Sequence, residues 1–178
     1  GLRYFLFEYE ECLREENKRN TNKISWKWED FTKSIKDSTT IEHILPQTPE
    51  SNSEWETMLN QTEGIKGKQE KARKANIHQL TNSLGNLVPL SQPLNSELGR
   101  KPFEQKVERY KNGSYAEIEI SQNKKWDKQA IENRSKMLLD FMFKRWGINE
   151  IIEYWGQDDD ERAKGQRQIQ KDLIFHIF

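Results

Sequence analysis

Apolar residues recur at helical spacing in two long stretches of this chain. Because positions three and four residues apart share one face of a helix, each stretch predicts an amphipathic helix. The first, residues 2–17, has an apolar face made of Leu2, Phe5, Leu6, Tyr9, Cys12 and Leu13. The second, residues 127–146, carries the longest apolar stripe, and Asp127 stands where an N-cap residue is expected. Weaker patterns predict shorter helices near residues 28–35, 53–59, 93–98, 102–112, 148–155 and 161–176.

Two short segments interrupt the helical pattern. Residues Thr39–Leu45 are compact and partly β-branched, and Pro46 ends them, which is typical of a strand. Asn86–Leu90 has a similar character. The residues between them, 47–83, are polar and poorly patterned. The order of strand, long excursion, strand and helix predicts a predominantly helical α+β fold with a small two-stranded core embedded in it.

The composition is that of a folded domain with an aromatic core. Hydrophobic residues make up only 33% of the chain, but six Trp, eight Phe and five Tyr supply large apolar surfaces. The single cysteine, Cys12, excludes an internal disulfide framework and a multi-cysteine zinc site. No apolar run reaches the roughly 20 residues of a membrane span, and no signal-peptide pattern opens the sequence. We therefore expect no membrane association and a cytoplasmic location.

The formal net charge of zero conceals a basic middle third. Residues 61–111 hold 10 Lys and Arg against 5 Asp and Glu, whereas both flanking regions hold slightly more acidic than basic residues. Attraction of phosphate depends on local potential rather than on total charge. The middle third is therefore the region in which we expect contacts to nucleic acid.

His43 is distinguished by its neighbours. It follows a carboxylate, Glu42, and precedes the strand-ending Pro46 by three residues. A neutral imidazole can take a proton from water near pH 7, which makes such a histidine a candidate general base. His78 and His176 lack this company, and we expect them to be structural.

The segments around His43 resemble a known family. The run Glu42-His43-Ile44-Leu45-Pro46-Gln47 resembles the first strand of HNH (His-Me finger, ββα-metal) endonucleases, and Leu84-Gly85-Asn86-Leu87 resembles their second strand. Asn95 takes the position of the last motif residue on the following helix. The order of motifs, continued by Phe103 and Lys106, resembles in particular the C-terminal domain of GmrSD-type, modification-dependent restriction enzymes and related phage-defence proteins. This implies an HNH-like nuclease domain over 1–146, with its ββα core at 38–111, and a helical extension over 147–178.

The resemblance implies roles for four residues. His43 would be the general base, and Asn86 would orient it or brace the hairpin. Glu42 and Asn95 would bind Mg²⁺ or Mn²⁺, since carboxylate and carboxamide oxygens are hard ligands that suit these ions. The ion would stabilise charge on the phosphate and on the leaving oxygen.

The role of Glu42 conflicts with strand geometry. Consecutive residues of a regular strand face opposite sides, so Glu42 and His43 share one site only if the strand twists or bulges at its end. If Glu42 faces away, Asp37 or a water molecule has to replace it.

The implied substrate is DNA, in double-stranded form, cleaved with little intrinsic sequence specificity. Target choice and nucleotide-dependent control would then lie in an N-terminal regulatory or NTPase domain outside this chain. The candidate phosphate contacts are Lys66, Lys68, Lys71, Arg73, Lys74, Arg100, Lys101 and Lys106. RNA stays open, because nothing in the sequence indicates recognition of a 2′-hydroxyl. The alternative hypothesis is a non-catalytic module that binds nucleic acid or protein on a degenerate HNH fold.

Overall fold

A computed structural model describes residues 1–17, 26–32 and 39–147 of the chain. The predicted helices at 148–155 and 161–176 lie outside the described residues, as does nearly all of the predicted extension 147–178. Within the described part, no helix is both long enough and apolar enough to cross a membrane.

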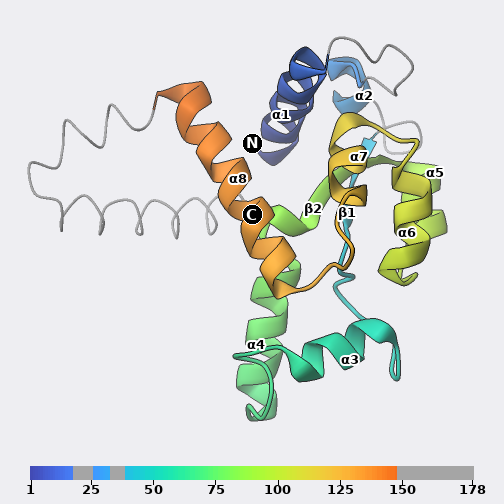
Figure 1. Cartoon of the computed structure of the whole chain (residues 1–178), viewed down its shortest axis with the longest axis vertical. Helices are drawn as coiled ribbons and strands as arrows, with labels where there is room; N and C mark the ends of the chain where they lie inside the picture. The colour runs from blue at the N-terminus through green and yellow to red at the C-terminus, as the bar shows by residue number, and fades with distance from the viewer. Residues whose placement is uncertain (18–25, 33–38, 148–178) are drawn as a thin grey trace, which may run out of the picture.

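The described residues form a small antiparallel hairpin surrounded by helices, as Figure 1 shows. This confirms the predicted helical α+β class. In chain order the elements are α1 (Leu2–Glu16), α2 (Trp28–Thr32), β1 (Thr39–His43), α3 (Glu54–Gln61), α4 (Glu70–Thr81), the 3₁₀ turn η1 (Leu84–Asn86), β2 (Leu87–Ser91), α5 (Gln92–Leu98), α6 (Phe103–Tyr110), α7 (Tyr115–Ser121) and α8 (Lys128–Trp146).

The hairpin separates two hydrophobic clusters. β1 and β2 pair in regular antiparallel register from Thr39 opposite Ser91 to His43 opposite Leu87. Residues opposite one another point to the same face, and the faces alternate along each strand. Val88 and Leu90 join one cluster with α3, α5, α6 and Trp126. Ile41 joins the other, which is built on α1 and α8.

Two helices were not predicted from the sequence. α4 spans Glu70–Thr81, inside the region with little apolar pattern, because Lys, Arg, Ala and Glu favour helix even without a continuous apolar stripe. α7 begins with a capping box, in which Ser114 and Glu117 bond each other's backbone N–H groups. Both oxygens of the buried Glu10 carboxylate, from α1, accept bonds from the first backbone N–H groups of α7. A long-range contact thus helps to set where α7 starts.

The turn before β2 is fixed against α8. Gly85 lies so close to this helix that a Cβ atom there would overlap the carbonyl oxygen of Ile131 and the backbone nitrogen of Ser135. The Gly85 N–H donates to Ser135 Oγ at 2.9 Å. Arg134 Nη1 donates to the carbonyl oxygens of Gly85 and Leu87, at 2.9 and 2.8 Å. The helix with the clearest sequence pattern therefore positions the second strand.

We expect Gly85→Ala to lower the free energy of unfolding by about 1–3 kcal/mol, because the added methyl forces η1 away from the backbone of α8. Urea denaturation followed by circular dichroism measures this loss. Ser135→Ala is the matched control, since it removes the two hydrogen bonds of Ser135 Oγ, with Gly85 N–H and with the Ile131 carbonyl, without adding volume, at a net cost of about 1–2 kcal/mol. Equal stability of Gly85→Ala and the wild type would contradict the close approach.

Candidate active site

His43 lies at the end of β1, where the imidazole is half-buried beside the end of α4. Its Nε2 atom is 3.2 Å from Oδ1 of Asn82, the residue that caps α4. The exposed Gln47 donates its Nε2 to the same oxygen at 3.0 Å. Three polar side chains from β1, the following loop and α4 therefore meet at one place on the surface.

The contacts of Asn82 determine the tautomer of His43. Asn82 Nδ2 donates to the carbonyl oxygen of His78 at 2.8 Å, which fixes Oδ1 as the atom that faces His43. A carboxamide oxygen can only accept, so Nε2 of His43 must carry the proton that it donates. The neutral ring then has its free lone pair on Nδ1. Nδ1 is thus the atom that can take a proton.

The surroundings of His43 favour this neutral form. Burial lowers the pKa of the imidazole below its ordinary value of 6.5, and the nearby Lys106 ammonium lowers it further, while the hydrogen bond to Asn82 opposes both. Near pH 7 the ring is therefore predominantly unprotonated, as a general base requires.

Glu42 points away from His43, into the interior. The register of β1 is regular through both residues, so their side chains leave opposite faces of the strand. Glu42 is only 4% exposed and forms an ion pair at 2.5 Å with Lys106 Nζ, whose residue is fully buried. Lys106 also donates to the carbonyl oxygen of Ile44 at 2.9 Å. Burial raises the pKa of Glu42 and lowers that of Lys106, and in each case the attraction of the partner opposes this effect.

Asn86 has a structural role, because both polar atoms of its side-chain amide already bond other parts of the chain. Its Oδ1 accepts from Leu45 N at 2.8 Å and from Trp126 Nε1 at 3.0 Å. Its Nδ2 donates to the carbonyl oxygens of Leu45 and Thr81, at 2.9 and 2.7 Å. The side chain is fully buried. Of the two roles implied for Asn86, orienting His43 and bracing the hairpin, these contacts fit bracing, because none of the four bonds goes to the His43 side chain.

Asn95 lies on α5, on the Glu42 side of β1. Its Nδ2 donates to Thr40 Oγ1 at 2.7 Å, and Thr40 shares a face of the strand with Glu42. The two residues implied as metal ligands thus lie on the same side of the hairpin, which is opposite to the side from which His43 leaves the strand.

These residues do not fit a Mg²⁺ or Mn²⁺ site as they are placed. The ammonium of Lys106 occupies the cation position at the Glu42 carboxylate, so Glu42 is not arranged to bind a metal in this structure. Within the part of the chain that the structure describes, no cluster of three or more His, Cys, Asp and Glu could hold a metal ion. Asp37, the suggested replacement, lies outside the described residues.

The predicted phosphate contacts fall into three groups. Lys66, Lys68, Lys71, Lys74 and Arg100 are exposed. Arg73 and Lys101 are half-buried, and each has a protein partner: Arg73 donates to Asn60, and Lys101 pairs with Glu97 at 3.8 Å. Lys106 is fully buried, so its predicted phosphate contact is wrong. His78, expected to be structural, is exposed on α4.

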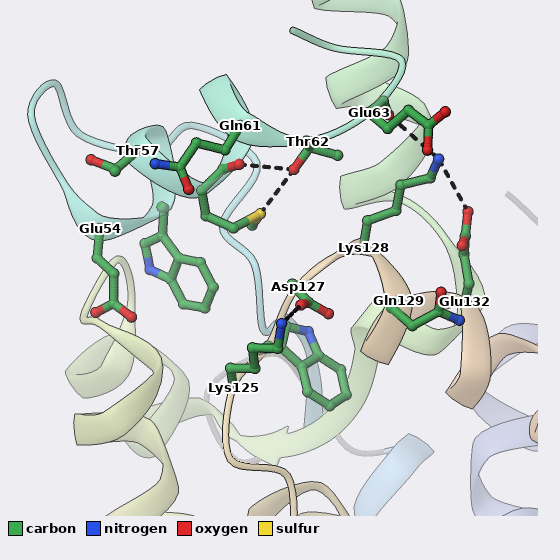
Figure 2. Close-up of a pocket in the computed structure, with 13 residues that line it drawn as sticks. Glu54, Thr57, Gln61, Thr62, Glu63, Lys125, Asp127, Lys128, Gln129 and Glu132 are labelled. Atoms are coloured by element: carbon green, nitrogen blue, oxygen red, sulfur yellow. Dashed lines mark hydrogen bonds and ion pairs between the residues drawn. The ribbon is translucent and has the colours of Figure 1, made fainter.

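A separate cleft of about 570 Å³ lies between α3 and the start of α8 (Figure 2). Its two lysines pair with neighbouring acids, Lys125 with Asp127 at 2.6 Å and Lys128 with Glu132 at 3.7 Å. The buried Trp126 belongs to its lining and links it to Asn86. None of the predicted site residues lines this cleft, and its mixed charges favour no ligand of one sign.

Sequence reasoning missed Asn82. The residue lies outside the motifs that carry the resemblance, three positions before Gly85. The only available signal is that Asn commonly occupies helix ends, and without a predicted α4 that signal had no helix to end.

The buried pair predicts a specific pattern of stabilities. We expect Lys106→Met to cost about 3–5 kcal/mol, because it leaves the Glu42 charge buried without a partner. Glu42→Gln/Lys106→Met should recover part of this loss, since both charges are then removed. Urea denaturation of the singles and the double measures the coupling, and additive losses would contradict the pair. Thermal melting with Mn²⁺ adds a direct test: metal-dependent stabilisation of the wild type that Glu42→Gln abolishes would restore Glu42 as a ligand.

Comparison with known proteins identifies the family. Searches of curated proteins and of solved structures find no significant match to this chain. The family model of the C-terminal domain of GmrSD restriction endonucleases matches residues 1–141, which is most of the chain and includes β1, β2 and α5. The chain therefore belongs to the GmrSD restriction endonuclease C-terminal domain family.

Proposed function

We propose that this domain hydrolyses phosphodiester bonds of double-stranded DNA, with His43 as the general base. The observation that carries the proposal is the state of His43: it is half-buried at the surface, Asn82 holds its Nε2, the tautomer places the ring's lone pair on Nδ1, and its pKa is lowered. Membership of a restriction endonuclease family supports DNA as the substrate. A cytoplasmic location and an N-terminal regulatory or NTPase partner domain are part of the same proposal.

The reaction follows from the free lone pair of Nδ1. His43 takes a proton from a water molecule at Nδ1, and the water oxygen forms a bond to phosphorus. The bond between phosphorus and the 3′ oxygen breaks, and this oxygen leaves with a proton from solvent. The products are a 5′-phosphate and a 3′-hydroxyl. Asn82 acts as a positioning residue, because it holds the ring and the proton on Nε2. Gln47 acts through Asn82, since it donates to the same Oδ1 atom.

Dependence on Mg²⁺ or Mn²⁺ belongs to this proposal as a further prediction. When bound, such an ion would stabilise the charge that develops on the phosphate oxygens. Neither of the implied ligands is arranged for it: Glu42 holds Lys106, and Asn95 donates to Thr40. The metal would have to bind on other groups or displace Lys106.

One observation favours a second candidate. The engagement of Glu42 by Lys106 also fits a domain that has lost metal-dependent catalysis and only binds nucleic acid. The two candidates differ in their activity. An HNH-type nuclease cleaves DNA and loses cleavage when His43 is substituted, whereas a binding module binds nucleic acid but does not cleave it.

We expect His43→Ala to reduce cleavage of supercoiled plasmid by at least about a hundredfold, the contribution typical of a general base. The assay compares wild type and variant in Mg²⁺, in Mn²⁺ and in chelator. Lys136→Ala is the control, since Lys136 is exposed on α8 and lies outside both the proposed chemistry and the predicted phosphate contacts. Unchanged cleavage by a folded His43→Ala variant would contradict the proposal, and absence of cleavage by the wild type in every condition would favour the binding module.

The pH profile tests the identity of the base. Protonated His43 cannot accept a proton, so kcat/KM should fall as pH decreases through an apparent pKa below 6.5. Asn82→Asp places a carboxylate beside the ring and favours its protonated form. The apparent pKa at which kcat/KM falls on the acidic side should therefore rise by about one pH unit. Asn82→Ala should lower kcat without this rise in the apparent pKa. If the apparent pKa of kcat/KM is the same in Asn82→Asp and the wild type, another group is the base.

A further inference from the structure

Helix α4 has two faces with different roles. Arg73, Ile77 and Leu80 follow one another at spacings of four and three residues, which places them on one side of the helix. Ile77 and Leu80 pack with the hydrophobic cluster of α3, α5 and α6. Arg73 Nη2 donates to Asn60 Oδ1 of α3 at 2.8 Å. This side therefore attaches α4 to the rest of the domain.

The opposite side carries basic groups into solvent. Lys71, Lys74 and His78 are all exposed and lie three or four residues apart, so they form a single line on the helix surface. We call these three residues the α4 track. Asn82 follows His78 by four residues and continues the same line.

The track leads to the candidate active site, because its continuation, Asn82, holds His43 Nε2 at 3.2 Å. With a rise of 1.5 Å per residue, Lys74 lies about 12 Å and Lys71 about 16 Å from Asn82 along the helix axis. A rise of 3.4 Å per nucleotide in B-DNA makes these lengths roughly four to five base pairs. Figure 1 shows α4 below the hairpin, extending away from it beside α3.

We propose that the α4 track binds backbone phosphates of duplex DNA on one side of the bond that faces His43. This inference rests on the proposed function and specifies which of the basic residues serve it. Exposed ammonium groups attract phosphates without reading bases, which fits a domain that contributes position rather than sequence choice. Arg73 is excluded from the track, because its side chain is directed to Asn60.

One acidic residue modulates the track. Glu70 pairs with Lys74 at 3.1 Å, and both side chains are largely exposed, so the pair is weak and opens easily. A bound phosphate would compete with the Glu70 carboxylate for the ammonium. Removal of this carboxylate should therefore strengthen binding of DNA.

The test measures binding without cleavage. A fluorescein-labelled 20-base-pair duplex is titrated with the whole chain in EDTA, and anisotropy gives Kd over a range of salt concentrations. We expect Lys71→Ala/Lys74→Ala to weaken binding roughly tenfold or more at 0.1 M salt, and to reduce the slope of log K against log salt by about two. Glu70→Gln should tighten binding severalfold.

The matched control removes the same charge elsewhere. Lys136→Ala/Lys144→Ala takes two exposed lysines from α8 and should leave both Kd and slope near the wild-type values. An equal effect of the two double variants would overturn the track, because binding would then follow net charge alone. Tighter binding of single-stranded DNA or of duplex RNA than of duplex DNA would overturn the assignment of the ligand.

Failure of this inference is distinguishable from failure of the proposed function. The binding assay needs no turnover, and His43→Ala should bind the duplex as the wild type does. A domain that cleaves through His43 but binds independently of Lys71 and Lys74 retains the proposed function and loses the track. A domain that binds through the track but does not cleave retains the track and loses the proposed function.

Discussion

Four hydrogen bonds from the side chain of Asn86 hold together the parts of the chain on which the candidate site depends. They join the segment after β1 at Leu45, the end of α4 at Thr81, and the loop before α8 at Trp126. Because the amide is fully buried, any one of these bonds left unmade would expose a polar group to an apolar surrounding, at a cost of about 1–3 kcal/mol. His43 precedes Leu45 by two residues, and its partner Asn82 follows Thr81 directly. The Asn86 side chain thus fixes both sides of the His43–Asn82 contact although it touches neither side chain.

The second constraint is the buried ammonium of Lys106, which pairs with Glu42 of β1. Lys106 is fully buried, and the Glu42 carboxylate and the Ile44 carbonyl supply oxygen acceptors for its ammonium. Such a pair adds little net stability but makes loss of either partner costly. The pair fixes the backbone where β1 ends. The positive charge of the Lys106 ammonium also lowers the pKa of His43. Lys106, which the sequence indicated as a phosphate contact, therefore supports His43 from inside the protein.

The sequence was sufficient for features that depend on local pattern. The apolar stripes predicted α1 and α8, the β-branched run and the strand-ending Pro46 predicted β1, and the family motif selected His43, Asn86 and Asn95 as a set. It was insufficient where long-range contacts decide. The start of α7 is helped by Glu10 from α1, and the environment of Lys106 is created by Glu42, 64 residues away. Strand alternation already indicated that Glu42 and His43 face apart, and the regular register up to His43 confirms that geometric argument over the role that the resemblance implied.

α4 connects the two functional proposals physically. One side of the helix anchors it through Arg73, and the other presents Lys71 and Lys74 to solvent and ends at Asn82, the partner of His43. On these proposals, a phosphate bound on the track contacts the same helix whose end holds His43 in its tautomer. Binding of DNA and orientation of His43 then share one structural element, so a displacement of α4 disturbs both. A loop carrying the same lysines would attract phosphates equally well but would fix neither their distance from His43 nor the proton on Nε2. The helix therefore gives the two lysines a defined separation from His43, as the two proposals together require.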